Sequence, residues 1–118
     1  MKDIVISVTA ETSDVKPSKP VLAVQGEHLQ SQVIVEFADR FIDGSATLEY
    51  KKQSGQKGSL PLTKGDGVYT AGITNELTNE VPRISCQIKV VQQATEQGTP
   101  VFKSKIFHLT VCECIDDE

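Results

Sequence analysis

Residues 83–111 constrain the fold of this chain most strongly, because two alternating apolar segments there are joined by a polar connector. Apolar residues occupy every second position of both segments: Ile84, Cys86, Ile88 and Val90, then Phe107, Leu109 and Val111. Successive side chains of a strand point to opposite faces, so each segment is expected to have one buried and one exposed face. Residues 92–100 between them hold no large apolar side chain and read as a loop. The pattern predicts a β-hairpin.

Shorter segments of the same kind precede this hairpin, separated by clusters of Gly, Pro, Asn and Asp. The expected strands are residues 4–9, 21–24, 32–37, 46–51, 59–62 and 68–73. No segment shows a helical period, so we predict an all-β chain: an antiparallel immunoglobulin-like β-sandwich of about 7–9 strands, with a small barrel as the alternative. The core is predicted to contain Ile84, Ile88, Val90, Phe107, Leu109, Val111, Val33, Val35 and Phe37.

Two segments are candidate edges of this predicted sheet. Pro61 has no N–H to donate, so the strand at 59–62 is expected to be an edge or irregular. Residues 1–20 comprise an N-terminal strand and a proline-containing connector. Because an unpaired edge can dock another chain, we expect the strand at 4–8, with its proline-bearing connector, to reach a partner. Deletion of residues 1–20 tests this expectation, which holds if the truncated domain keeps its fold and loses association. Residues 74–82 are expected to cross over to the long strand, anchored by Leu77 and Val81.

Length and charge limit the class of protein. A chain of 118 residues suits one domain, residues 1–118, ending in a solvated acidic stretch at 116–118. The net charge of −4 argues against a nucleic-acid partner, which favours clustered Lys and Arg. No apolar run is long enough to span a membrane. The N-terminus alternates and carries Asp3, so it is interpreted as a strand and not a signal peptide, and the chain as a product made in the cytoplasm.

The three cysteines, Cys86, Cys112 and Cys114, do not form a disulfide framework by their number and spacing. In the predicted hairpin, Cys86 should lie opposite residues 105–107, about 20 Å from Cys112 at the strand rise. Cys112 and Cys114 lie two apart on one strand face, with parallel side-chain directions. We therefore expect three free thiols.

No constellation of residues indicates catalysis. His108, Cys112 and Cys114 share a strand face, but four strand residues span about 13 Å, too far for two ligands of one zinc ion. His28 lies in a polar turn, and Asp66 beside Gly67 reads as a hairpin turn and not as a calcium loop. Lysines are scattered among acids and Gln and are interpreted as promoting solubility: Lys16, Lys19, Lys51, Lys52, Lys57 and Lys64. No catalytic, cofactor-binding or metal-binding residue is predicted, and the chain is not expected to be an enzyme.

Several strand and turn segments resemble, in order and spacing, one family of viral proteins. The segments begin with Val24-Gln25-Gly26-Glu27 and Ser31-Gln32-Val33-Ile34-Val35-Glu36-Phe37, and continue with residues 62–69, 73–78 and 103–111. Together they resemble the N-terminal domain of phage baseplate upper proteins and related tail proteins of phages and prophages of Gram-positive bacteria. The resemblance covers about residues 20–115 and contains no catalytic motif. It implies a β-sandwich that docks a larger protein into the tail, located in the virion.

This resemblance implies a non-enzymatic assembly module of the baseplate or distal tail. Its expected partners are other phage tail or baseplate proteins or further copies of itself as a homo-oligomer, with no nucleic acid and no membrane. Family members continue beyond this domain, so a receptor-reading part is expected either to be missing or to be supplied by another protein. The alternative function is a carbohydrate-binding or adhesion module. Such modules stack sugars on exposed aromatic rings, whereas this chain has no Trp, and its two tyrosines, Tyr50 and Tyr69, are predicted to face the core.

Overall fold

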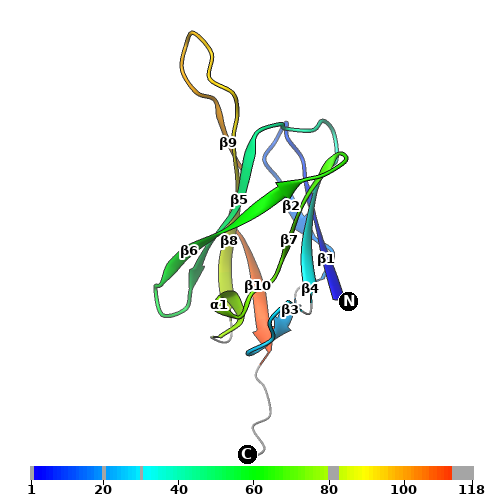
Figure 1. Ribbon diagram of the computed structural model, residues 1–118, viewed down its shortest axis with the longest axis vertical. Coiled ribbons are helices and arrows are strands. Elements are labelled where there is room, and N and C mark those ends of the chain that lie inside the picture. Colours follow the sequence, from blue (N-terminus) through cyan, green and yellow to red (C-terminus); the bar gives the residue numbers. More distant parts are fainter. Residues whose placement is uncertain (1, 20, 30, 80–82, 113–118) are drawn as a thin grey trace, which may run out of the picture.

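The computed structural model describes residues 2–19, 21–29, 31–79 and 83–112, and these residues form an all-β fold (Figure 1). The all-β prediction is confirmed. One four-residue helix, α1 (Asn75–Thr78), interrupts the strands. The strands are β1 (Lys2–Val8), β2 (Val15–Pro17), β3 (Val21–Val24), β4 (Ser31–Phe37), β5 (Ser45–Lys52), β6 (Lys57–Lys64), β7 (Val68–Gly72), β8 (Arg83–Val91), β9 (Val101–Lys103) and β10 (Phe107–Cys112).

The strands join into one curled sheet with the order β2-β1-β4-β7-β6-β5-β8-β10-β3, and β9 pairs with β8. β6 connects the two halves, because it pairs with β5 along Lys57–Leu62 and with β7 only at Thr63 and Lys64. Buried residues from both halves form a single hydrophobic cluster, so the sheet curls around its own core like half a barrel (Figure 1).

Two strand pairs in this sheet are parallel, which corrects the prediction of a purely antiparallel immunoglobulin-like sandwich. β1 runs parallel to β4, from Lys2 opposite Ser31 to Val8 opposite Phe37. β10 runs parallel to β3 at the other end of the sheet. Parallel neighbours need a long connection between them, and β1 reaches β4 only after the chain has formed β2 and β3. The described residues also hold ten strands, more than the seven to nine expected.

Alternation along the strands decides which side chains enter the core. In β1 the residues Ile4, Ile6 and Val8 are fully buried. Burial removes apolar surface from water and contributes about 1.5–3 kcal/mol for each large aliphatic side chain. Of the nine predicted core residues, eight are buried and Phe37 is half-buried. Phe37 lies at the end of β4, where its ring makes edge contacts with the rings of Phe41, Tyr69 and Phe102.

The predicted hairpin of residues 83–111 is present, but its second strand is divided into β9 and β10. β8 pairs with β9 through Lys89 opposite Lys103, and with β10 through Cys86 opposite Phe107. Two residues of β8 therefore face the three residues 104–106, which is the geometry of a β-bulge. The pairing of Cys86 with Phe107 confirms the predicted register. The bulge reverses the alternation of inward and outward side chains along the second strand, so Ser104 and Phe107 both face inward.

The two predicted edge strands differ in outcome: β1 lies inside the sheet, whereas the strand with Pro61 has a free side around that residue. β1 lies between β4 and β2, which pairs with it at Ile6–Val8, so the prediction of an N-terminal edge is wrong. Residues 10–19, expected to be a connector, contain β2 and return along β1. The strand that carries Pro61 lies inside the sheet order, yet around Pro61 it pairs on one side only, with β5. Among the described residues, the terminal strands of the sheet are β2 and β3.

The crossover after β7 is a short structured segment. Residues 75–78 form α1, and Leu77 is buried as predicted. Val81, the second expected anchor, lies outside the described residues, as do the acidic stretch 116–118 and Cys114. Within the part of the chain that the structure covers, no helix is long and apolar enough to cross a membrane.

Candidate functional site

The described histidines and cysteines, His28, His108, Cys86 and Cys112, do not converge on a common site. His108 is exposed on β10, and its Nδ1 lies 3.1 Å from the Oγ of Ser85 on β8. His28 lies in the loop after β3, where its Nδ1 accepts the N–H of Asn75 at 3.0 Å. Cys86 and Cys112 are free thiols, the first buried and the second half-buried. Within the described ranges, no three His, Cys, Asp or Glu residues lie close enough together to hold a metal ion.

Burial changes the chemistry of Cys86. Desolvation by the surrounding core raises the pKa of its thiol to about 12. The nucleophilic form of cysteine is the thiolate, so Cys86 is unreactive at neutral pH while the protein is folded. Its Sγ lies 3.9 Å from the carbonyl oxygen of Ile84, a contact within its own strand. Cys86 therefore acts as a small apolar core residue.

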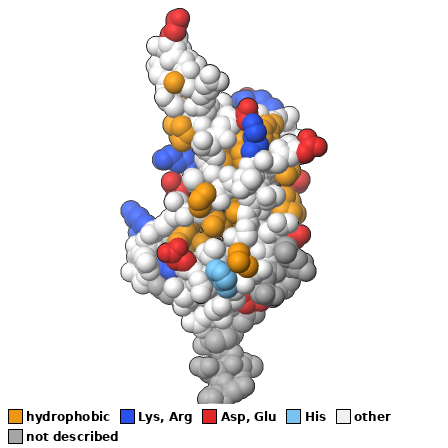
Figure 2. All heavy atoms as spheres, in the orientation of Figure 1, with side chains coloured by type: hydrophobic (Ala, Val, Ile, Leu, Met, Phe, Trp, Pro, Cys, Tyr) orange, Lys and Arg blue, Asp and Glu red, His pale blue; other side chains and the backbone are white. Residues whose placement is uncertain are grey.

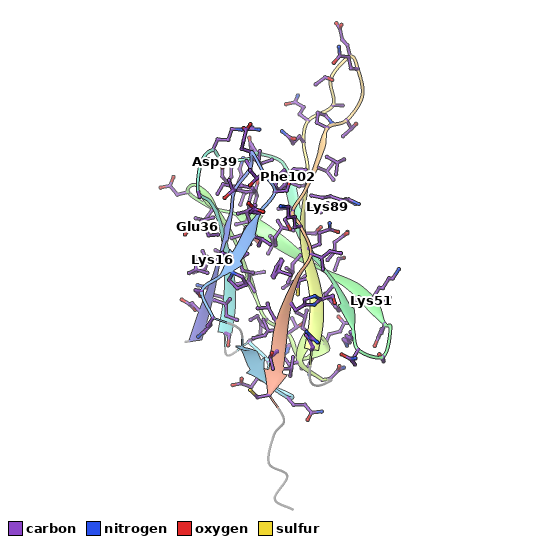
Figure 3. All side chains as sticks on the ribbon, turned by 180° about the vertical axis from the view of Figure 1, so that it is seen from behind. Lys16, Glu36, Asp39, Lys51, Lys89 and Phe102 are labelled. Atoms are coloured by element: carbon purple, nitrogen blue, oxygen red, sulfur yellow. The ribbon has the colours of Figure 1, made fainter. Side chains whose placement is uncertain are left out.

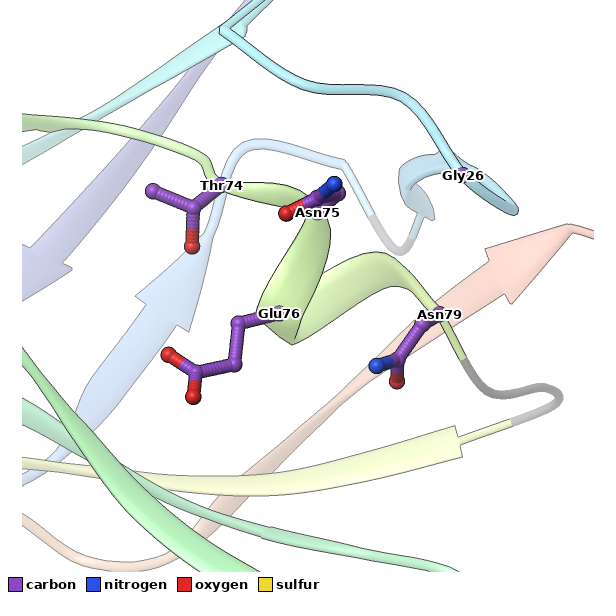
Figure 4. Close-up of a pocket in the computed structure, with 5 residues that line it drawn as sticks. All are labelled: Gly26, Thr74, Asn75, Glu76 and Asn79. Carbon is purple, nitrogen blue, oxygen red and sulfur yellow. The ribbon is translucent and has the colours of Figure 1, made fainter.

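A shallow pocket of about 510 Å³ lies between α1 and the turn after β3 (Figure 4). Its lining residues are Gly26, Thr74, Asn75, Glu76 and Asn79. Hydrogen bonds join its two walls: Gly26 N donates to the Thr78 carbonyl at 3.0 Å, and Thr78 Oγ1 donates to the Glu27 carbonyl at 2.7 Å. These lining side chains supply no nucleophile beside a base. The pocket therefore lies where hydrogen bonds join α1 to the turn after β3.

The hairpin formed by residues 92–100 projects beyond the body of the sheet (Figure 1). We call this segment the arm. A turn closes its tip, with Thr95 N donating to the Gly98 carbonyl at 2.7 Å, and Gln92 N donates to the Pro100 carbonyl at 2.9 Å near its base. Glu96 is its one charged residue, and Figure 2 shows a surface of mostly uncharged polar atoms with acidic atoms at the tip. Val101 at the base is 47% exposed. The arm thus offers backbone and amide groups to a neighbour.

The outer face of the sheet carries a row of polar side chains across four adjacent strands. Lys57 of β6 lies opposite Lys51 of β5, Lys51 lies opposite Ser85 of β8, and Ser85 lies opposite His108 of β10. We call these four residues the cross-strand row. Figure 3 shows Lys51 beside the β5–β6 hairpin, on the side of the sheet away from β1 and β4. Both lysines are exposed, and neither forms an ion pair within the described residues.

A groove of about 600 Å³ runs along this row. All four residues of the row line it, three of them with basic side chains. Its lining also includes Ile106, which is 64% exposed, and Glu49, whose carboxylate lies 3.8 Å from the Nζ of Lys89. A second hollow beside it is lined by Arg83 together with Lys51 and Lys52. This face is therefore basic on a chain whose net charge is −4.

Sequence reasoning missed the cross-strand row, since the lysines were interpreted as scattered. A signal was present in the sequence: Lys51 and Lys57 flank the turn at 53–55 symmetrically, so a hairpin there places them opposite each other. The contribution of Ser85 and His108 depends on the register of β5, β8 and β10, which local sequence does not supply.

The tyrosines face the core, as predicted from the sequence. Tyr69 is fully buried, and its hydroxyl donates to the Ile42 carbonyl at 2.7 Å and accepts the Gly44 N–H at 3.0 Å. Tyr50 is 6% exposed. Phe41 is 36% exposed, and its ring stacks on the buried ring of Tyr69 with centroids 5.1 Å apart. Neither tyrosine offers an open ring face on which a sugar could stack.

Two carboxylates fasten loops at the end of the sheet nearest the arm. Asp39 accepts the backbone N–H groups of Ala10 at 2.8 Å and Glu11 at 2.9 Å, and these bonds hold the pKa of its carboxyl below the usual value. The pKa of Asp14 is also lowered, chiefly by its 2.6 Å hydrogen bond from Lys105 Nζ. Lys105 N in turn donates to the Ser13 carbonyl at 2.8 Å. These contacts join the β1–β2 turn to the bulge of the hairpin.

The fold is similar to that of one solved phage protein domain. The N-terminal domain of phage TP901-1 ORF48 superposes on this chain with a TM-score of 0.62, covering 95% of this chain and 99% of that one. The sequence identity is 10%, so the similarity shows a shared fold. No protein-family model matches this sequence. No curated protein matches it either.

Proposed function

We propose that this protein is a non-enzymatic structural module of a phage or prophage tail, docking to other tail proteins or to further copies of itself. The observation that carries the proposal is the structural similarity to a phage protein domain along 95% of the chain. The order of strand and turn segments resembles the N-terminal domain of baseplate upper proteins, which supports a place at the baseplate or distal tail. The proposed location is the virion, after synthesis in the bacterial cytoplasm, with residues 1–118 acting as one domain.

Two structural features support docking over catalysis. The arm projects from the sheet with a polar surface that is uncharged except for Glu96 near the tip, which suits insertion beside a neighbouring protein. The terminal strands β2 and β3 present backbone groups at the two ends of the sheet, and such edges pair readily with another chain.

The experiment removes the arm without disturbing the sheet. Val91 and Val101 lie directly opposite each other, so residues 92–100 can be replaced by Asn-Gly, the two-residue turn that such a pair accepts. The full-length protein and this variant are each mixed with the purified products of the neighbouring tail genes, and binding is measured by calorimetry. We expect the full-length protein to bind at least one of them and the variant to bind at least about tenfold more weakly.

The control and the contradicting outcomes are separate measurements. Thermal unfolding checks that the arm-less variant keeps its fold, since the arm packs on nothing in the core. Equal binding by both proteins would move the docking site away from the arm. If the full-length protein binds none of the tail proteins and instead binds a polysaccharide on a glycan array, the carbohydrate-binding or adhesion function replaces the tail function.

A further inference from the structure

The cross-strand row contains an unfavourable arrangement that the sheet itself does not resolve. Lys51 and Lys57 are paired directly across β5 and β6, and both side chains are exposed on the outer face. Like charges directly opposite in an antiparallel pair destabilise it. The acidic residue that lines the groove, Glu49, lies near Lys89. Bound carboxylates would relieve this repulsion.

The groove along the row has the dimensions and chemistry of a site for an extended acidic peptide. The row crosses four strands, about 14 Å at a strand spacing near 4.8 Å, which is the length of about four extended residues. Its basic side is formed by Lys57, Lys51 and His108, with Arg83 beside them in the second hollow. Ile106 supplies exposed apolar surface at the same groove. An occupant with closely spaced carboxylates and one aliphatic side chain matches these features.

The chain itself contains such a segment. Residues 113–118, Glu-Cys-Ile-Asp-Asp-Glu, carry four carboxylate side chains and one isoleucine, and they lie outside the described residues. We propose that this acidic segment of one copy docks on the cross-strand row of a second copy, so that the protein self-associates through Lys51 and Lys57. The proposal rests on the proposed function, in which the module docks to further copies of itself, and it names the surface and the segment that do so.

Reach favours a second copy over the same chain. His108 lies four residues before Cys112, about 13 Å back along β10, and Lys51 lies two strands further across, so Cys112 and Lys51 are about 16 Å apart. A segment that follows Cys112 must reverse direction to approach the row, which takes about two residues. The remaining four residues span at most about 14 Å. The segment of a partner copy has no such restriction.

The test is a charge swap read out by sedimentation equilibrium. In the Lys51→Glu/Lys57→Glu variant the row becomes acidic, and in the Asp116→Lys/Asp117→Lys variant the segment becomes basic. We expect wild-type protein to self-associate at about 0.05 M salt and to dissociate towards monomer at about 0.5 M, because the contact is electrostatic. Each double variant should weaken self-association at least about tenfold, and the four-residue swap should restore it.

Two controls make the result specific. Lys19→Glu/Arg40→Glu changes the net charge by the same amount on exposed residues outside the row and outside the terminal strands, and it should leave self-association unchanged. The four-residue swap has the net charge of the wild type, so its recovery cannot arise from net charge. All substituted basic residues are exposed, and thermal unfolding checks that every variant is folded.

Three outcomes would overturn the proposal. A wild-type protein that stays monomeric at low salt excludes it. So does a four-residue swap that fails to recover association, or a loss on Lys51→Glu/Lys57→Glu with no loss on the acidic variant, which would mean that another acidic surface occupies the groove. None of these outcomes affects binding to the other tail proteins, which the arm experiment measures separately.

Discussion

Ser104 and Ile88 exchange two hydrogen bonds across the hairpin at the bulge. Ser104 N donates to the Ile88 carbonyl at 2.9 Å, and Ile88 N donates to the Oγ of Ser104, also at 2.9 Å. The bulge removes the backbone carbonyl that would otherwise accept the Ile88 N–H, and a buried hydroxyl takes its place. The two strands of the hairpin therefore stay hydrogen-bonded to each other where the second strand changes register.

Replacing Ser104 with Ala should destabilise the protein by about 1–3 kcal/mol, because it leaves the buried Ile88 N–H without an acceptor. Urea unfolding followed by circular dichroism measures the change. Ser59→Ala on the exposed face of β6 is the matched control and should stay within about 0.5 kcal/mol of wild type. Equal effects of the two substitutions would show that the Ser104 hydroxyl is dispensable.

Ile88 is also a test of the core itself. It is fully buried on the longest strand, so Ile88→Ala should cost about 2–5 kcal/mol through lost burial and the cavity left behind. Ile106→Ala makes the same chemical change at a residue that is 64% exposed, and its cost should be below about 0.5 kcal/mol. Both values come from the same urea experiment. A cost of Ile88→Ala below about 1 kcal/mol would contradict its place in the core.

The hydroxyl of Tyr69 ties the loop before β5 to the core. Tyr69→Phe should cost about 1–3 kcal/mol, because the buried Ile42 carbonyl loses its donor. Tyr50→Phe removes a hydroxyl that makes no hydrogen bond within the described residues, so it should be close to neutral. Thermal unfolding of the two variants gives the comparison. If both lose the same stability, the bond to Ile42 is not the cause.

Asp39 should make the stability of the folded protein depend on pH in the acidic range. Backbone hydrogen bonds lower the pKa of the Asp39 carboxyl in the folded state, so the ionised carboxylate contributes to the free energy of unfolding. This contribution is fully present above the ordinary pKa of Asp, near 3.8, and is lost as the pH falls through the lower pKa of the folded state. Asp39→Asn should reduce stability at neutral pH and flatten the decline between about pH 5 and pH 2. Urea midpoints across this range are the measurement, with Asp66→Asn in the exposed β6–β7 turn as control. Parallel pH curves for Asp39→Asn and wild type would contradict the assignment.

Cys86 should not react with a thiol reagent in the folded protein. Its pKa of about 12 leaves almost no thiolate at pH 8, and the core excludes the reagent. We expect Cys86→Ala to leave the amount of fast labelling in native protein unchanged and to lower the total measured in urea by one thiol. A disulfide that joins Cys86 to Cys112, found by mass mapping, would contradict both the pairing with Phe107 and the expectation of free thiols.

The N-terminal strand shows why an edge is hard to recognise in a sequence. Ile4, Ile6 and Val8 alternate as they would in an edge strand with one buried face, and the structure buries all three. The alternation does not reveal that β4 pairs along the whole of β1 and that β2 covers its other side. Deletion of residues 1–20 is therefore expected to unfold the protein, and not to leave an intact domain that has lost only its docking strand.

The sequence by itself determined most of the strands, the buried face of each of these and the positions of most turns, but not β2 or the bulge between β9 and β10. These properties are local, because a two-residue period and a turn-forming dipeptide act within a few residues. It also determined the register of the long hairpin as far as Cys86 and Phe107, since a polar connector leaves little choice of pairing.

Only the tertiary structure decided which strands are neighbours where no hairpin turn joins them. An apolar face can be buried against any other apolar face, so alternation alone does not select the parallel partners β1 with β4 and β10 with β3. The same limit applied to the candidate docking surface. Lys51 and Lys57 could be paired from the turn between them, but Ser85 and His108 joined them only when β5, β8 and β10 were placed side by side. Neighbour choice depends on the burial of the whole core at once, which no single segment of the sequence contains.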